Sequence, residues 1–474
     1  MKSWLERLEI RIVPLVNLLP ELRIEAEHFQ KKYVDLLEKL SVRTCEHLEN
    51  LVASDIRTGH TPSMKVASYY DGTYRFIKTD NLRINEIKGP YSHTLTKKGY
   101  DTLRRVHLQE GDIIVTIIGA TYDVIARCAL VRPELLPATI NQNIALIRAD
   151  REKISPEYLV TYMNCKYGRM YLEYLARQME QVNLNCQEIG KDMIVLPGSW
   201  LEKMVDKTVS AAYDLLSDAK NTFVKAEHIL REALRFNEYH PSHRQISIRS
   251  MQEIFSANRF DAEYYQPKYD AILQQLARIS DGTIGTRCSI YDQNFTPDAA
   301  TTYRYIELAD IGNQGIITGC TTDTGDNLPT RARRIVHTGN LLVPSIEGSL
   351  QSMALVSDAY DGALCSTGFF VLDADDINSE TLLVLFKSAP MQALLKRQCA
   401  GTILTGFNKD ALCSIPLPVI PLDVQKQIQA SVRQSFELHT QAVTLLATAR
   451  RAVECFIEQG EAAALTVLAP DSEA

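Results

Sequence analysis

Two long stretches of the chain carry apolar residues at helical spacing and contain neither glycine nor proline. One lies between Trp200 and His240, and the other lies between Ile428 and Phe456. A stripe of this kind predicts a helix of about 36 residues, which is roughly 54 Å at 1.5 Å per residue. Small residues on the first stripe allow close approach of a neighbouring helix: Ala212, Ala219, Ala226 and Ala233. We therefore expect the two long helices to pack on each other as an antiparallel coiled coil.

Four residues are expected to hold that packing: Leu215, Ala219, Leu446 and Ala449. The alternative is that each long helix lies on its own globular domain and does not contact the other.

Short β-branched runs separated by Gly, Asn and Asp precede each long helix. Examples are Ile113–Ile118, Thr139–Ile147 and Gly368–Leu372. Runs of this kind predict short strands. Stretches with helical spacing follow at 156–179 and 379–398. The pattern indicates a strand-rich globule with helices, given twice.

An internal repeat explains why the pattern occurs twice. The segment Arg23–Leu40 matches Arg259–Leu276 at eight positions, and Tyr74–Ile77 followed by Asn81 matches Tyr303–Ile306 followed by Asp310. Further matches keep the same order: Gly111–Val115 with Gly339–Val343, Gly119 with Gly348, Asp150 with Asp375, and Leu196–Pro197 with Leu417–Pro418. A repeat with one order and small loop deletions predicts two tandem copies of one structural unit.

The repeat divides the chain into seven segments. They are 1–45, an N-terminal helical segment; 46–198, the first globule; 199–245, the first long helix; 246–280, a repeat of the N-terminal helical segment; 281–420, the second globule; 421–459, the second long helix; and 460–474, a C-terminal tail. We expect an α+β fold in which two tandem-repeated strand-rich globules are joined by two long antiparallel helices with pseudo-two-fold symmetry.

Composition indicates a folded globular protein. The chain has 474 residues, 45% apolar and 23% charged, and its ten cysteines are scattered without metal-binding spacing. Charged residues such as Glu6 and Arg7 interrupt the first apolar stretch, and no apolar run reaches membrane-spanning length. We therefore expect a cytoplasmic protein with no membrane partner. A net charge of −7 is unlike that of a dedicated nucleic-acid binder, so DNA binding would need help from a partner.

Catalytic motifs are missing from the sequence. It contains no Asn-Pro-Pro-Tyr or Asp-Pro-Pro-Tyr run, no Walker-type phosphate loop and no Gly-x-Gly-x-x-Gly that opens a helix. His240 and His243 lack further ligands at metal-binding spacing, so a loop pair is the preferred interpretation. We expect no catalytic residue, no bound metal and no cofactor.

The paired order of these motifs resembles the DNA specificity subunits of type I restriction-modification systems. The segment Pro421-Leu-Asp-Val-Gln-Lys-Gln-Ile428 is similar to that family's entry to its spacer helix, and the resemblance covers Arg23 to about Gln459. It implies that each globule is a target recognition domain that reads one half of an asymmetric bipartite target on double-stranded DNA. It also implies docking of two DNA adenine methyltransferase subunits, which carry AdoMet, on antiparallel spacer helices, with a restriction or motor subunit as an open further partner. The first copy departs from the pattern because its run Leu196-Pro197-Gly198-Ser199-Trp200 is followed by no Gln like that of the second copy, which affects its docking contacts.

Candidate base-reading residues must be able to pair with base edges and must lie in loops. In the first copy we select Lys97, Lys98, Arg104, Arg105, Tyr122, Asn183 and Asn185. In the second copy the corresponding places hold Arg331, Arg333, Arg334, Ser349, Gln351 and Asn408. A second function class stays open: a duplicated protein-interaction scaffold that guides a different effector without direct DNA readout. The acidic balance of the second globule favours that alternative.

Overall fold

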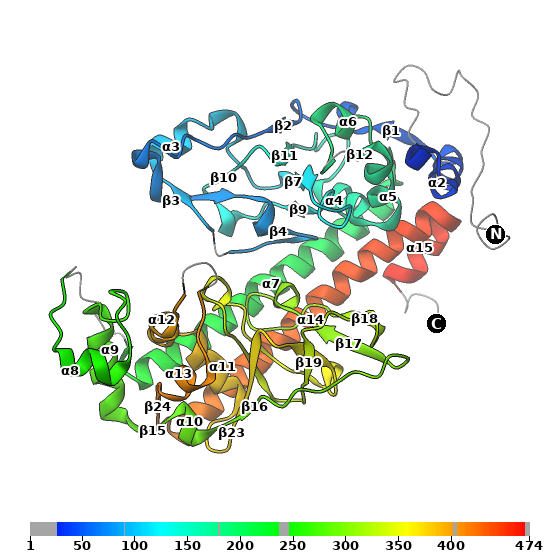
Figure 1. Cartoon of the computed structure of the whole chain (residues 1–474). Helices are drawn as coiled ribbons and strands as arrows, with labels where there is room; N and C mark the ends of the chain where they lie inside the picture. The colour runs from blue at the N-terminus through cyan, green and yellow to red at the C-terminus, as the bar shows by residue number, and fades with distance from the viewer. Residues whose placement is uncertain (1–25, 90, 179–180, 237–245, 402–404, 470–474) are drawn as a thin grey trace, which may run out of the picture. The chain divides into compact units, whose positions relative to one another are not determined.

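The computed structural model describes residues 26–89, 91–178, 181–236, 246–401 and 405–469 (Figure 1). The chain forms two compact units. The first unit takes Met1–Asp214 and Gln441–Ala474, and the second unit takes Leu215–Thr440. The long helices α7 (Ser199–Ala233) and α14 (Leu422–Gln459) each contribute one part to each unit. The long helices begin within one residue of the predicted starts at 199 and 421.

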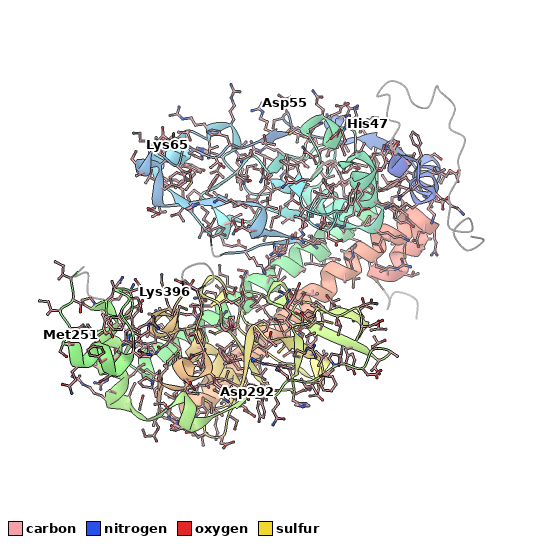
Figure 2. All side chains as sticks on the ribbon, in the orientation of Figure 1. His47, Asp55, Lys65, Met251, Asp292 and Lys396 are labelled. Carbon is pink, nitrogen blue, oxygen red and sulfur yellow. The ribbon has the colours of Figure 1, made fainter. Side chains whose placement is uncertain are left out.

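The first unit is built from short strands with helices beside them, and charged side chains such as those of Asp55 and Lys65 project from its surface (Figure 2). Its α-helices besides α7 and α14 are α2 (Lys31–Ser41), α3 (Lys97–Asp101), α4 (Pro156–Asn164), α5 (Lys166–Leu175), α6 (Cys186–Gly190) and α15 (Glu461–Leu468). Its strands are β1 (Cys45–His47), β2 (Arg57–Thr58), β3 (Tyr70–Ile77), β4 (Leu82–Arg83), β5 (Glu86–Ile87), β6 (Thr94–Leu95), β7 (Ile113–Thr116), β8 (Ile118–Gly119), β9 (Cys128–Leu130), β10 (Ala138–Ile140), β11 (Ile144–Ile147), β12 (Arg177–Gln178), β13 (Val182–Asn183) and β14 (Met193–Val195).

The second unit uses the same kinds of element. Its helices are α8 (Met251–Ala257), α9 (Lys268–Ile279), α10 (Ile284–Arg287), α11 (Ser379–Lys387), α12 (Ala389–Gln398) and α13 (Lys409–Cys413). Its strands are β15 (Ser280–Thr283), β16 (Cys288–Tyr291), β17 (Thr302–Ile306), β18 (Thr321–Thr324), β19 (Ala332–Ile335), β20 (Leu341–Pro344), β21 (Ala354–Leu355), β22 (Leu364–Ser366), β23 (Phe369–Ala374) and β24 (Pro416–Pro418).

Sheet topology confirms the predicted repeat. A four-stranded sheet has the order β2-β11-β7-β9 in the first unit and β16-β23-β20-β21 in the second, with all pairs antiparallel. In each unit one parallel pair lies in a second sheet, β3 with β10 and β17 with β22. The strand before the long helix also pairs in the same way, β1 with β14 and β15 with β24. The α+β fold class with a tandem repeat is therefore correct.

Matching residues close the same turns in both units. Asn81 ends a 3-10 turn and accepts from the backbone N of Lys78 at 3.0 Å, and Asp310 accepts from the backbone N of Glu307 at 2.8 Å. The residues after β3 and β17 thus explain one of the strongest matches in the sequence. A second match is explained by Gly111 and Gly339, which have φ of +82° and +88° at the turn before β7 and β20. Glycine adopts this left-handed conformation without steric strain.

The helix that opens each copy buries matching positions. In α2 the buried residues are Tyr33, Leu36 and Leu40, and in α9 they are Tyr269, Ile272 and Leu276. The spacing of three and four residues is that of one helical face. The expected helices at 156–179 and 379–398 are each two helices, because the chain leaves the helical conformation at Cys165 and at Ser388.

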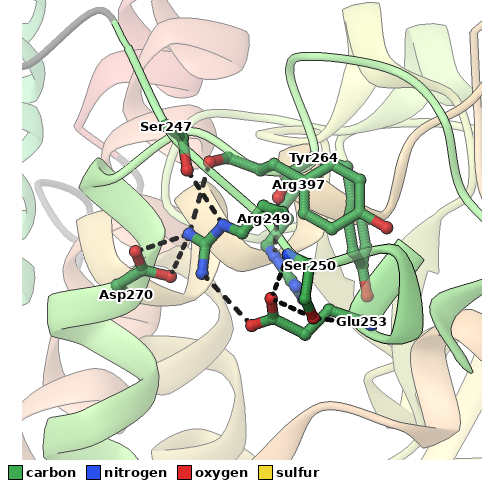
Figure 3. A network of polar contacts seen from close by, with 8 residues as sticks. Ser247, Arg249, Ser250, Glu253, Tyr264, Asp270 and Arg397 are labelled. Carbon is green, nitrogen blue, oxygen red and sulfur yellow. Dashed lines mark hydrogen bonds and ion pairs between the residues drawn. The ribbon is translucent and has the colours of Figure 1, made fainter.

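The segment before α9 is attached to the second unit through Arg249 (Figure 3). Its Nη2 donates to Asp270 at 2.6 and 2.8 Å and its Nε donates to the Ser247 hydroxyl at 2.9 Å. Ser250 and Glu253 cap α8 through a reciprocal pair of hydrogen bonds. These polar contacts hold α8 with large apolar side chains outward, since Met251 is 60% exposed and Phe255 is 65% exposed.

The long helices pack together within the second unit. The hydroxyl of Ser435 on α14 donates to the carbonyl of Ala219 on α7 at 2.7 Å, and Phe223 and Val432 belong to one buried cluster. Of the four residues expected to hold the two helices together, Ala219 and Ala449 are buried and Leu215 and Leu446 are half-buried. A contact between Leu215 and Leu446 across the two helices stays a prediction, and so does the pseudo-two-fold symmetry of the two units. Among the small residues of the first stripe, Ala212 and Ala226 are buried and Ala233 is exposed.

The first turn of each long helix binds the first turn of a helix of its globule. The backbone N of Ser155, which caps α4, donates to Glu202 on α7 at 2.7 Å. In the other copy the backbone N of Asn378, which caps α11, donates to Gln425 on α14 at 2.9 Å. Glu202 therefore makes the intramolecular contact that Gln425 makes in the second copy, and the sequence difference does not alter this arrangement.

The C-terminal segment contains a helix that the sequence pattern did not predict. Residues 461–468 form α15, which begins just after Gly460, a residue with φ of +98°. None of the described helices combines the length and the apolarity needed to cross a bilayer.

Asp206 on α7 is expected to make the stability of the first unit depend on pH. Burial raises its pKa to about 6, the Ser155 hydroxyl opposes that rise by donating to it, and the charges of Glu157 and Glu202 add to it. The unfolded carboxyl titrates near 3.8, so stability falls as the pH rises from about 4 to about 6. We expect Asp206→Asn to raise the melting temperature at neutral pH by a few degrees, or about 1 kcal/mol after allowance for solvent screening. The gain should vanish below about pH 4.

Asp218→Asn is the matched control, because Asp218 lies on the same helix and is exposed. Thermal unfolding of both variants across this pH range measures the effect. An equal gain from Asp206→Asn at low and neutral pH would contradict the assignment.

Ala219 should tolerate no larger side chain. It is 1% exposed and its carbonyl accepts the Ser435 hydroxyl, so Ala219→Leu forces a side chain into an occupied space. We expect a loss of about 1–3 kcal/mol of unfolding free energy, measured by denaturant titration. Lys220→Leu, at the exposed neighbouring position, should change stability by less than about 0.5 kcal/mol. Equal effects of the two substitutions would mean that Ala219 does not lie in a close helix contact.

Candidate nucleic-acid interface

A turn before β7 and before β20 marks where each segment of basic candidates ends. Asp112 accepts from the backbone N of Gln109 at 2.7 Å and Asn340 accepts from the backbone N of His337 at 2.8 Å. Arg148 also binds Asp112 with Nε and Nη2 at 2.7 and 2.8 Å. This bidentate pair on a buried carboxylate makes the turn rigid in the first unit.

The basic candidates of the first unit lie on two short helices. Lys97 and Lys98 are the first residues of α3, and Arg104 and Arg105 begin the 3-10 turn Arg104–Val106. Lys97 pairs with Asp101 at 3.4 Å, and the ammonium of Lys98 lies 5.6 Å from the centroid of the Tyr69 ring. Arg104 and Arg105 are exposed, and neither guanidinium has a hydrogen-bond or ion-pair partner among the described residues. They are thus available to an external anion.

The polar candidates of the first unit lie around a different sheet. Asn183 is exposed on β13, which pairs with β8 and β12, and Tyr122 is in the turn after β8. Asn185 caps α6: its side chain accepts from the backbone N of Glu188 at 2.8 Å. The structure therefore gives Asn185 a local structural role, and it leaves the Asn183 side chain exposed.

The arginines expected to read bases in the second unit are engaged within the unit. Arg331 pairs with Glu307 at 2.7 Å, and Arg333 donates to the Thr330 carbonyl at 2.8 Å. Arg334 donates to the carbonyl of Phe369 and stacks over Phe370. Their existing partners would compete with a base or a phosphate.

Two of the remaining candidates of the second unit, Gln351 and Asn408, also have side-chain partners. Gln351 donates to Gln392 at 2.9 Å, and Asn408 caps α13 by accepting from the backbone N of Ala411 at 2.9 Å. Ser349 ends the 3-10 turn Glu347–Ser349 after β20 and is half-buried. Asn408 is therefore the structural counterpart of Asn185.

The two candidate sets do occupy equivalent places. In the first unit His107, which follows the Arg104–Val106 turn, forms a β-bridge with Thr139 on β10. In the second unit β19 pairs with β22, which is the counterpart of β10. In the second unit Gly406 forms isolated β-bridges with Ile346 and with Ala400. This pairing matches that of β13 in the first unit, which lies between β8 and β12. Each set therefore comes from two sheets of its own unit.

Three arginines near β9 are not among the candidates that the sequence predicts. Arg83, Arg127 and Arg169 come from three separate segments, and only the fold brings them to one strand. Neither spacing nor local pattern connects them. In the sequence these arginines differ from their surroundings only when the two copies are aligned. The residues at the equivalent positions of the second copy are uncharged.

Among the described residues we find no metal site. No three His, Cys, Asp or Glu side chains in that part of the chain lie together in a way that could hold a metal ion. His240 and His243 lie outside the described residues.

Solved structures similar to this chain were found, whereas no protein-family model matches it and no curated protein matches it. The HsdS subunit from Thermoanaerobacter tengcongensis is 16% identical, with a TM-score of 0.29, over 88% of this chain and 96% of the other. The type I restriction-modification S subunit from M. genitalium is 11% identical, with a TM-score of 0.37, over 88% and 95%. A chain from a study of complex assembly and conformational transition of the type I system is 15% identical, with a TM-score of 0.27, over 90% and 97%.

The difference between free and engaged guanidiniums can be tested with two variants. Arg104→Ala with Arg105→Ala should weaken DNA binding several-fold and leave the melting temperature unchanged, because these side chains have no described partner. Arg334→Ala should lower stability by about 1–2 kcal/mol, because it leaves the Phe369 carbonyl without its donor. Binding to a labelled duplex and thermal unfolding measure both effects. The assignment is wrong if the Arg104 and Arg105 substitutions lower the melting temperature more than Arg334→Ala.

Proposed function

We propose that this chain is the non-catalytic DNA sequence-specificity subunit of a type I restriction-modification complex, or of a related methyltransferase-based defence complex. Each unit reads one half of an asymmetric bipartite target on double-stranded DNA. Two DNA adenine methyltransferase subunits bind the chain and supply AdoMet and the chemistry. The chain itself contributes recognition and geometry.

The proposal rests on one observation. The two units have the same fold but carry different side chains at equivalent positions. Arg104 and Arg105 lie in a 3-10 turn beside β10, and Arg331, Arg333 and Arg334 lie at β19, which pairs with β22, the counterpart of β10. A conserved scaffold with altered surface residues suits two different half-sites, because sequence is read by side chains in loops and on strands. The motif order in the sequence, which resembles this family, supports the same conclusion.

Exposed apolar residues on the long helices support the docking of partner subunits. Trp200 is 43% exposed and Leu422 is 64% exposed, and each lies at the start of a long helix. Val224 and Val443 are each 49% exposed farther along these helices. Apolar side chains that a helix leaves in solvent favour contact with another protein. These positions are candidates for the methyltransferase contacts.

A duplicated protein-interaction scaffold is the second candidate function. The acidic side chains of the second globule outnumber its nine basic ones, and the apolar face of α8 is exposed. Both observations favour a protein partner over a nucleic acid for that unit. Salt-dependent binding of the purified complex to DNA distinguishes the two functions, because release of counterions from DNA makes affinity fall steeply with salt.

An exchange of recognition domains tests the proposal directly. Residues 46–198 are replaced by the corresponding domain of a relative, and the variant is co-expressed with its methyltransferase partner. We expect one half of the methylated sequence to change and the other half to remain, because each unit has its own sheets and its own candidate residues. Sequencing of methylated sites in the host genome reads the result.

The matched control replaces residues 281–420 in the same way and should change the opposite half. A swap that alters both halves together, or that leaves the methylated sequence unchanged, overturns the proposal. A complex that methylates no DNA but retains a protein partner supports the scaffold function.

A further inference from the structure

Three arginines from separate segments meet at β9; we call them the β9 arginine cluster (Arg83, Arg127 and Arg169). Arg127 directly precedes β9 in the chain, and Nη1 of Arg169 donates to the Ala126 carbonyl at 3.2 Å. Arg83 belongs to the β4–β5 hairpin, and the backbone N of Asn85 in that hairpin donates to the Cys128 carbonyl at 2.9 Å. The residues around 126–128 are therefore the common point of all three segments.

A buried amide fixes this arrangement from inside. Asn164 is 2% exposed, and its Nδ2 donates to Asn85 Oδ1 at 2.7 Å and to the Cys128 carbonyl at 2.9 Å. Its Oδ1 accepts from the backbone N of Cys128 at 3.3 Å. One side chain thus connects α4, β9 and the β4–β5 hairpin, so the cluster is held by the core and does not depend on flexible surface loops.

The guanidiniums of the cluster bind backbone carbonyls. Arg127 Nε donates to the carbonyl of Asp123 at 2.8 Å, and Arg83 Nη1 donates to the carbonyls of Asp80 and Leu82 at 3.2 and 3.0 Å. Among the described residues no carboxylate forms an ion pair with any of the three. Carbonyl contacts orient a guanidinium without neutralising its charge, so the cluster keeps a net positive charge.

The charges lie close enough to influence one another. Burial lowers the pKa of Arg127, the neighbouring charges of Arg83 and Arg169 lower it further, and the charge of Asp123 opposes the decrease. Burial also lowers the pKa of Lys88, with Glu86 opposing and Arg83 and Arg127 adding to the decrease. Like charges held together in this way are stabilised by an external anion.

The second unit has no such cluster at the equivalent place. Gly312 follows Ile311 at the position of Arg83, and the buried Met353 precedes β21 as Arg127 precedes β9. Gln392 on α12 occupies the place of Arg169 on α5, and its Nε2 donates to the Leu350 carbonyl at 3.1 Å. In both copies the second helix thus donates to a backbone carbonyl near this strand, Ala126 in the first and Leu350 in the second, while the charge is present only in the first.

We propose that the β9 arginine cluster binds the phosphodiester backbone of DNA, so that the first unit makes an electrostatic contact for which its counterpart in the second unit has no equivalent. This inference rests on the proposed function, since it assigns a phosphate contact to a DNA-reading unit. Three closely placed guanidiniums can bind adjacent phosphate oxygens through paired N–H donors. Such a contact determines position and affinity, and it does not read the base sequence.

The salt dependence of binding tests the cluster. The full chain, in complex with its methyltransferase partner, is titrated against a fluorescein-labelled duplex of mixed sequence at several salt concentrations. The triple variant Arg83→Gln, Arg127→Gln, Arg169→Gln should reduce the slope of log K against log salt by about 2–3, since each phosphate contact contributes about 0.9. The matched control removes the same charge from exposed positions: Arg57→Gln, Lys65→Gln, Lys153→Gln. Arg57 is on β2, at the opposite edge of the four-stranded sheet from β9.

Two more variants keep the test decisive if the glutamine triple variant unfolds. The charge-retaining triple variant Arg83→Lys, Arg127→Lys, Arg169→Lys should preserve the slope, and Arg83→Gln alone should lower it by about one. Equal slopes for the wild-type protein and the glutamine variants of the cluster, or equal losses in the glutamine and control triple variants, overturn the inference. A wild-type complex whose binding does not depend on salt contradicts the proposed function itself, and the two failures are thus distinguishable.

Discussion

Burial of one side of α7 and α14 is the constraint on which the rest of the structure depends. Helices of 35 and 38 residues with a continuous apolar side are not stable alone in water, so each must be covered along its length. The two helices cover each other at Ala219 and Ser435, and in the second unit α11 and α12 belong to the same buried cluster as both helices. The contacts Ser155–Glu202 and Asn378–Gln425 then fix where each globule is attached.

The contacts that attach each globule to a long helix are polar, whereas the contacts that bury the sides of the long helices are apolar. This difference has a physical reason. Apolar burial supplies free energy without specifying a position along a helix, whereas a backbone N–H at a helix start has one direction and needs one acceptor. Glu202 and Gln425 provide that acceptor with different side chains, so the geometry survives the substitution. The cost of using a carboxylate appears at Asp206, whose pKa rises through burial and is raised further by the charges of Glu157 and Glu202.

Much of the fold could be predicted from the sequence, because periodicity and repeat are properties of the chain itself. The starts of α7 and α14, the duplicated unit and the buried faces of α2 and α9 follow from spacing alone. Contacts could not be predicted in the same way. Asn185 and Asn408, two of the candidate base-reading residues, both cap helices, because a helix N-terminus needs an acceptor and asparagine supplies one. Their contact with bases stays a prediction. The β9 arginine cluster joins residues as far apart as 83 and 169, and only the fold places them together.

The division of the chain into units has a consequence for its synthesis. The second unit is one continuous segment, 215–440, whereas the first unit needs 441–474 as well as 1–214. Glu454 accepts from the backbone N of Lys166 at the start of α5, and Glu458 accepts from Tyr167. A ribosome therefore adds every residue of the second unit before it adds the last helix of the first, α15. The repeat that is translated first is completed last, and until then the α5 surface that α14 covers remains exposed to chaperones and proteases.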